Sequence, residues 1–130
     1  MQQLLTPESL SAVMGAYHGF HDAEIKRITL RPLDDGSGHL DVEVELVATN
    51  HQCRKTEIIE LFLHKVVEMK FSYDKNIDYP NVRDEIAVGF YDNLAYVDFG
   101  AACESRTSPS DYRSLDRFFV CESVSLSITG

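Results

Sequence analysis

The chain has 130 residues, of which 44% are hydrophobic and 25% charged, and its formal net charge at pH 7 is -9. This length and balance predict a single domain over residues 1–130 with its own core, and they exclude a disordered chain. The chain has 21 acidic and 12 basic side chains, and this negative charge argues against nucleic acid or a membrane surface as a partner. The charge either attracts a cationic protein partner or only keeps the protein soluble.

The three cysteines, Cys53, Cys103 and Cys121, cannot all pair within one chain, and none has a C-x-x-C spacing. The N-terminal residues lack a basic segment followed by a long apolar run, and no run of about eighteen apolar residues occurs. We therefore expect reduced thiols and a cytoplasmic protein.

One helix is predicted near the N-terminus, because Thr6 can cap it, Pro7 has the φ of a first helical position, and Glu8 complements the helix dipole. Apolar side chains then recur at spacings of three and four up to Tyr17, which gives one stripe for packing on a sheet. Gly15 or Gly19 is expected to end this helix.

After Phe20 the apolar pattern changes to the period of two that is typical of strands. Residues 23–30 change parity midway, which predicts a bulge near Lys26 and Arg27, and Asp92-Asn93 predicts a tight hairpin turn. A long surface loop is expected over residues 100–117. The strands are expected at residues 23–30, 40–48, 56–63, 67–73, 86–90, 94–99 and 118–128.

The sequence shows no internal repeat and no strand–helix–strand spacing, so these strands are expected to be antiparallel. The fold class is α+β, mainly antiparallel β: a curved sheet or partial barrel of about seven strands with one N-terminal helix. A sandwich of two sheets is the alternative.

Reactive residue types concentrate at the corner between the helix and the first long strand, at His18, His21, Asp22 and Glu24. Imidazole and carboxylate groups could bind a divalent metal or act as a general base, which would make a small metal-dependent or hydrolytic enzyme. The spacing also suits a structural corner in which Asp22 and His21 make hydrogen bonds. Because the other histidines are isolated in the sequence, we assign no metal ligand, no cofactor and no catalytic residue.

A second candidate site is the acidic stripe of Asp41, Glu43 and Glu45, three like charges on one face of a strand. Like charges destabilise a strand face unless basic neighbours form ion pairs with them, and Lys55, Arg27 or Arg31 could do so. An unanswered stripe would attract a cationic partner and would act mainly on the association rate.

Four segments resemble, in their order, the immunity-protein-50-like family found beside bacterial polymorphic toxins. They are FHDAEI, LDVEVELVA, IIELFLHKVVEMKF and FFVCESVSLSI, and they extend over much of residues 16–128. The resemblance covers the Phe20-His21-Asp22 corner and the strand that ends at Phe71. It implies a small cytoplasmic bacterial domain that binds and neutralises a toxin, and it implies a binder and no catalytic residues.

The preferred hypothesis is therefore a protein-binding domain, and the resemblance makes it an immunity protein. The alternatives are the small enzyme centred on residues 18–24 and a structural or homodimeric domain, since an open sheet has edges that a second copy can cover.

Overall fold

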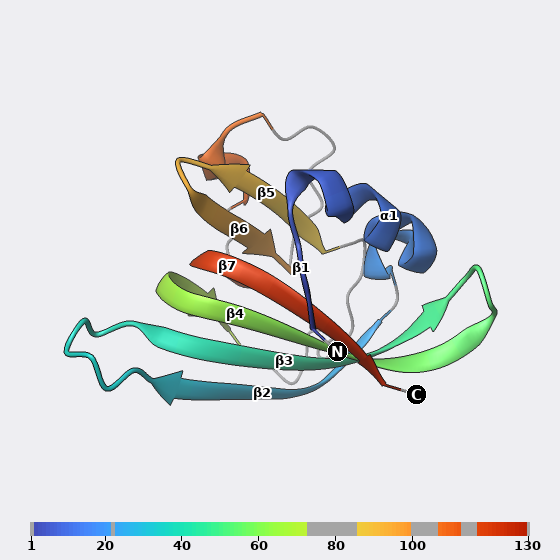
Figure 1. The fold of residues 1–130 in the computed structure, drawn as a ribbon, viewed down its shortest axis with the longest axis horizontal. Helices are drawn as coiled ribbons and strands as arrows, with labels where there is room; N and C mark the ends of the chain where they lie inside the picture. Colours follow the sequence, from blue (N-terminus) through green and yellow to red (C-terminus); the bar gives the residue numbers. More distant parts are fainter. Residues whose placement is uncertain (1, 22, 73–85, 100–106, 113–116, 130) are drawn as a thin grey trace.

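A computed structural model describes residues 2–21, 23–72, 86–99, 107–112 and 117–129. Its elements are one α-helix, seven strands and two short 3₁₀ helices (Figure 1). In chain order they are β1 (Gln2–Leu4), α1 (Pro7–Tyr17), η1 (His18–Phe20), β2 (Glu24–Pro32), β3 (Leu40–Asn50), β4 (Lys55–Phe71), β5 (Ala87–Tyr91), β6 (Leu94–Asp98), η2 (Pro109–Tyr112) and β7 (Arg117–Thr129).

Helix α1 begins as predicted and ends differently. The backbone N–H of Ser9 donates to the Thr6 hydroxyl at 3.1 Å, and the N–H of Thr6 donates to the Ser9 hydroxyl at 2.9 Å, which completes a capping box. At the other end His18 has a φ of 49°, and its N–H donates to the carbonyl of Met14. Of the two glycines predicted to end the helix, Gly15 lies inside it, whereas Gly19 follows His18 directly and also has a positive φ, 67°.

The seven strands form one antiparallel sheet that does not close, with the order β2-β3-β4-β7-β6-β5. Strand β1 pairs with β7 beyond the end of β6, so two short strands share one edge of β7. Helix α1 and the β5–β6 hairpin lie on the same side of the long strands (Figure 1). The expected α+β fold is confirmed as an open curved sheet, and the two-sheet sandwich is excluded.

Seven strands were predicted and seven are present, but they are not the same seven segments. The predicted strands over residues 56–63 and 67–73 are one strand, β4, which bends at Lys65, where φ is 51°. The pairing of β4 shifts there, and Val66 is buried while Val67, predicted to face the core, is 47% exposed. A local bulge therefore preserves pairing through a change of parity. The seventh strand is β1, which the sequence did not indicate.

Two other turn predictions are confirmed. The pairing of β2 with β3 shifts between Ile25 and Arg27, which is the expected bulge. Asp92 and Asn93 both have positive φ, 52° and 64°, between the paired strands β5 and β6. The expected loop at residues 100–117 lies mostly outside the described residues. The part of it that is described includes η2.

The main core lies between α1 and the inner face of the sheet, where side chains such as Phe20, Leu46 and Phe119 are almost fully buried. A second, smaller cluster lies on the other face of β5, β6 and β7, where Tyr112 of η2 packs with Tyr96 and Phe118. Gly89 makes this packing possible, because a Cβ there would lie 2.5 Å from the Tyr112 ring. Among the described residues, no helix has the length and apolar composition needed to cross a membrane.

Candidate functional site

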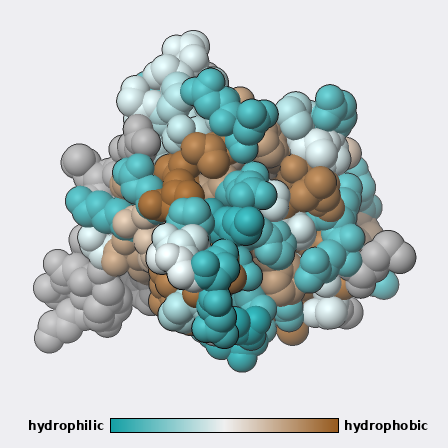
Figure 2. Space-filling model, turned by 60° about the vertical axis from the view of Figure 1, so that its left-hand side comes forward, coloured by the Kyte–Doolittle hydropathy of each residue, from teal (hydrophilic) through white to brown (hydrophobic). Residues whose placement is uncertain are grey.

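The face of the sheet that points away from α1 carries alternate side chains of β2, β3, β4 and β7, and we call it the outer face. Its residues are opposite in parity to the buried ones on the same strands. The polar and charged side chains on this face include Arg27, Arg31, Asp41, Glu43, Glu45, Glu60 and Ser127. On the side of the molecule that Figure 2 brings forward, apolar residues form small patches separated by polar ones.

Each carboxylate of the predicted acidic stripe has a partner within the chain. Glu43 pairs with Arg31 at 2.7 Å, and Glu45 pairs with Arg27 at 3.2 Å. Asp41 accepts a hydrogen bond from the backbone N–H of Lys65 at 3.0 Å. Arg27 and Arg31 therefore neutralise two carboxylates of the stripe, as the sequence suggested. Lys55 forms no ion pair with the stripe among the described residues.

Glu60 adds a carboxylate to the outer face that the sequence analysis did not single out. The register places it directly opposite Glu45 of β3 on one side and Ser127 of β7 on the other. Within the described residues no ion pair or hydrogen bond of the Glu60 side chain is found. The period of a strand puts Glu60 on the same face as Phe62, but only the β3–β4 register shows that Glu60 faces Glu45.

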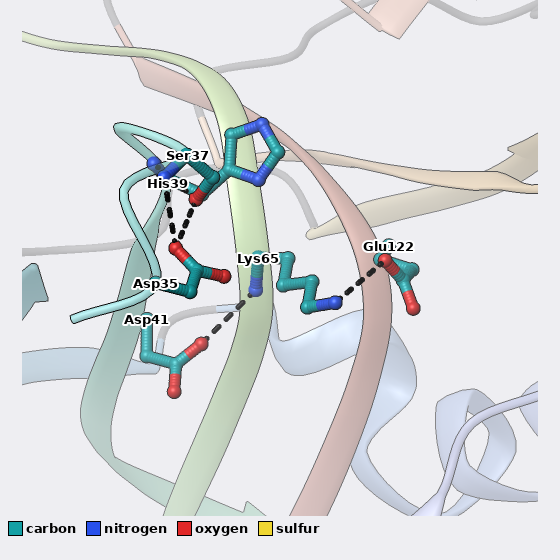
Figure 3. Close-up of polar contacts among 6 residues, drawn as sticks. All are labelled: Asp35, Ser37, His39, Asp41, Lys65 and Glu122. Carbon is teal, nitrogen blue, oxygen red and sulfur yellow. Dashed lines mark hydrogen bonds and ion pairs between the residues drawn. The ribbon is translucent and has the colours of Figure 1, made fainter. Parts of the chain in front are cut away.

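The bend of β4 brings together residues from three strands (Figure 3). Asp41 of β3 receives the N–H of Lys65, and the Lys65 ammonium lies 3.8 Å from the carboxylate of Glu122 on β7. In the turn before β3, the Ser37 hydroxyl and backbone N–H both bind Asp35, and these hydrogen bonds lower the pKa of Asp35. Because each of these groups has an internal partner, the cluster fixes the bulge and the turn.

A pocket of about 360 Å³ lies at the predicted corner site. Three of the four predicted residues line it, namely His18, His21 and Glu24, and His51 joins them from the β3–β4 turn. Asp22, the fourth, lies outside the described residues. Val47, Ala48 and Thr49 of β3 and Thr56 of β4 complete the lining.

His18 and His51 stack face to face, with ring centroids 3.7 Å apart and an angle of 1° between the planes. The backbone N–H of His51 also donates to the carbonyl of Ala16 at 2.8 Å, which ties the β3–β4 turn to the end of α1. His51, which is isolated in the sequence, therefore joins the corner in space. What brings His51 to the corner is the contact of the β3–β4 turn with the end of α1, which local spacing in the sequence does not contain.

The stacked geometry bears on the metal hypothesis. An imidazole binds a metal through a nitrogen lone pair that lies in the ring plane. Two parallel, stacked ring planes share no point, so His18 and His51 cannot hold one ion in this arrangement. Consistently, no group of three or more His, Cys, Asp or Glu side chains among the described residues is placed to hold a metal ion.

The remaining reactive groups are a thiol and a phenol in the core. Cys121 is buried, and burial raises its pKa to about 12, whereas Cys53 is exposed; both are free, and Cys103 lies outside the described residues. Burial, and then the hydrogen bond that Tyr17 donates to Glu57 at 2.9 Å, raise the pKa of Tyr17 to about 12. Neither group is activated as a nucleophile or a base at neutral pH.

Two buried charged residues were missed by the sequence analysis: Asp98 of β6 and Arg117 of β7, which are 1% and 6% exposed. They lie on adjacent strands, where the N–H of Phe99 donates to the carbonyl of Arg117 at 3.0 Å. The sequence predicted the strand at residues 94–99 and assigned no face to Asp98. The second cluster covers one face of this strand, and no local pattern indicates it.

Comparisons with protein-family models, with curated proteins and with solved structures give no match to this chain.

Proposed function

We propose that this chain is a protein-binding domain whose outer face contacts a cationic protein. The observation that supports the proposal is the facing pair of Glu45 and Glu60. Like charges directly opposite each other in a sheet destabilise it. A lysine or arginine of a partner, inserted beside Glu60, would turn that repulsion into attraction.

The charge balance of the outer face points the same way. Around the facing pair, four carboxylates, of Asp41, Glu43, Glu45 and Glu60, lie with two guanidinium groups, of Arg27 and Arg31, so this part of the outer face has an excess of two negative charges. The net charge of the chain, -9, extends the same sign over longer distances. Such a field raises the association rate with a cationic protein and is weakened by salt.

An immunity role follows from the sequence resemblance alone and makes the proposal more specific. A domain of this kind would be a bacterial cytoplasmic protein, would bind a toxin, and would itself catalyse no reaction. A toxin that acts on nucleic acid carries positive charge to bind phosphates, so an acidic partner is its natural complement.

The experiment takes as probes the cationic proteins encoded next to this chain's gene, each purified as an inactive variant. We expect one of them to form a complex, and we expect its association rate constant to fall about tenfold or more between low and physiological salt. Glu60→Lys should slow association further. Asp34→Lys makes the same change in net charge in the exposed β2–β3 turn and should have a smaller effect.

The binding proposal fails if none of the cationic neighbours binds. The choice of the outer face fails if a complex forms and Glu60→Lys and Asp34→Lys change its association rate equally. The immunity role is tested separately, by asking whether co-expression of this chain restores growth to cells that make the active form of the bound protein.

A further inference from the structure

We propose that a groove between β1 and the β5–β6 hairpin is a docking site for one large apolar side chain, which basic residues flank in the sequence of a partner protein. The partner is the cationic protein of the proposed function, on which this inference rests. The outer face would attract that protein, and the groove would hold it.

The groove exists because two short strands, β1 and β6, share one edge of β7 without covering all of it (Figure 1). β1 pairs with residues 125–127 of β7, and β6 pairs with residues 118–121. Among the described residues, no strand therefore pairs with residues 122–123 on this side. The chain leaves the sheet after β1 and turns into α1 at the cap Thr6. A cavity of about 430 Å³ remains between this corner and the hairpin turn.

The groove is lined mainly by apolar side chains that the fold leaves partly exposed. Leu4 is 54% exposed, the largest value among the large hydrophobic side chains of the described residues. Tyr91 and Leu94 line the groove from the two ends of the hairpin turn, and Pro7 lines it from the first turn of α1. The cavity is large enough for one aromatic side chain and some water. Burial of apolar surface favours association, so this lining suits an anchor residue of a partner.

Carboxylates at the groove favour a partner segment that is basic around the anchor residue. Asp92 and Glu122 line the groove, and Glu8 follows in the first turn of α1. Within the described part of the chain, the one ion pair that these carboxylates form is that of Glu122 with Lys65, at 3.8 Å. Three carboxylates and one ammonium group leave the rim negative, so it attracts basic and repels acidic residues. The positive end of α1 is already complemented by Glu8 and by the capping box at Thr6.

The groove is continuous with the outer face along β7. Leu4 pairs with Ser125, so both lie on the outer face. Ser123, which lines the groove, lies four residues before Ser127, the residue opposite Glu60, and this separation is about 13 Å along the strand. A typical interface of about 800 Å² per partner is wider than that, so one protein can contact both places. Charged contacts act mainly on association and buried anchors on dissociation, so the two contributions can be separated.

Three blocked tripeptides test the groove on the unchanged chain without the partner: acetyl-Arg-Phe-Arg-amide, acetyl-Arg-Gly-Arg-amide and acetyl-Glu-Phe-Glu-amide. Binding is followed by NMR from the backbone resonances of Leu5, Asn93 and Ser123, with Leu30 on β2 as a distant reference. At about 10 mM the first peptide should shift the groove resonances, as expected for a dissociation constant of about 1 mM. The other two should bind at least about tenfold more weakly, because one lacks the apolar side chain and the other has the wrong charge.

Variants with matched controls locate the site. Leu4→Ser should weaken binding of the Arg-Phe-Arg peptide by about threefold or more, because it removes part of the apolar contact. Leu30→Ser replaces a leucine that is 48% exposed outside the groove and should leave binding unchanged. Asp92→Asn should weaken binding by about two- to fivefold, and asparagine tolerates the φ of 52° in this turn. Asp34→Asn, the same loss of charge in the β2–β3 turn, should have a smaller effect.

The groove proposal is overturned if the Arg-Phe-Arg peptide shifts none of the groove resonances, if the glycine or glutamate peptide binds as tightly, or if Leu4→Ser and Leu30→Ser have equal effects. Shifts of the same resonances when the chain alone is diluted would assign the groove to a second copy and would also overturn it.

The cationic partner separates this inference from the proposed function. Leu4→Ser should raise the dissociation rate constant of the complex by about threefold or more and leave the association rate constant unchanged. A complex whose dissociation Leu4→Ser leaves unchanged would overturn the groove as the anchor site and retain the outer-face contact. If no cationic protein binds, the proposed function fails, and the peptides still decide whether the groove takes a basic segment with an apolar side chain.

Discussion

Replacing Glu60 by lysine is expected to make the free protein more stable, although it removes the group that we assign to partner binding. In the unchanged chain Glu60 faces Glu45 across β3 and β4. A like-charged pair in this position costs, and an oppositely charged pair contributes, about 0.2–1 kcal/mol. Arg27 already occupies one side of Glu45 at 3.2 Å, so the new lysine would share that carboxylate. The expected gain in the free energy of unfolding is therefore about 0.5–1 kcal/mol.

Urea unfolding of the unchanged chain, Glu60→Lys and Glu60→Gln measures this gain. At about 10 mM salt the order of stability should be Lys, then Gln, then Glu, and at about 1 M salt the three should converge, because the screening length falls from about 30 Å to about 3 Å. Asp34→Lys controls for the general effect of lowering the net charge. If Glu60→Lys destabilises the chain, or gains no more than Asp34→Lys, then the facing pair does not carry the repulsion that we assign to it.

Two further predictions concern the core. Gly89→Ala should lower the free energy of unfolding by about 1–3 kcal/mol, because the new Cβ meets the Tyr112 ring. If that contact is the cause, adding Tyr112→Leu to the same chain should recover part of the loss. Additive losses of the two substitutions in urea unfolding would refute this explanation. At alkaline pH the buried thiol of Cys121 stays protonated up to a pKa of about 12, while in the unfolded chain it ionises from its ordinary value near 9. The folded state thus holds more protons between these values, so stability should fall as the pH rises from about 9 to about 12, and Cys121→Val should reduce that slope; an unchanged slope would assign the loss to other groups, such as Tyr17.

Most of the fold could be predicted from local patterns. The capping residues at Thr6 and Pro7, the strict alternation of residues 40–48 and the Asp92-Asn93 turn each depend on neighbours in the sequence, and each was confirmed. The bend at Lys65 was misinterpreted as a break between two strands, because a bulge and a turn both change the parity of apolar residues. Only the continuous pairing of β4 with β7 distinguishes them.

The candidate sites were less predictable, because they depend on which strands are neighbours. The sequence placed His18, His21 and Glu24 at one corner, but it could not bring His51 there, since His51 lies thirty residues further along the chain. The sequence likewise indicated Arg27 and Arg31 as partners of the acidic stripe, but it contains no local sign that Glu60 faces Glu45. Local patterns therefore predict the residues of a site that are close in the sequence. The residues that a neighbouring strand or turn contributes depend on strand order, which local patterns do not give.

The facing carboxylates of Glu45 and Glu60 also allow a test of whether the outer face binds a partner or only contacts solvent. A solvated sheet face needs polar side chains, and serine, threonine or a lysine at position 60 would serve that need without repulsion from Glu45. If Glu60→Lys both stabilises the free chain and slows association with a cationic partner, the repulsion is a cost in stability that binding relieves, as is common where surface groups serve a function. If it stabilises the chain and leaves association unchanged, the pair is an unfavourable detail of the surface, and the partner must contact another part of the molecule.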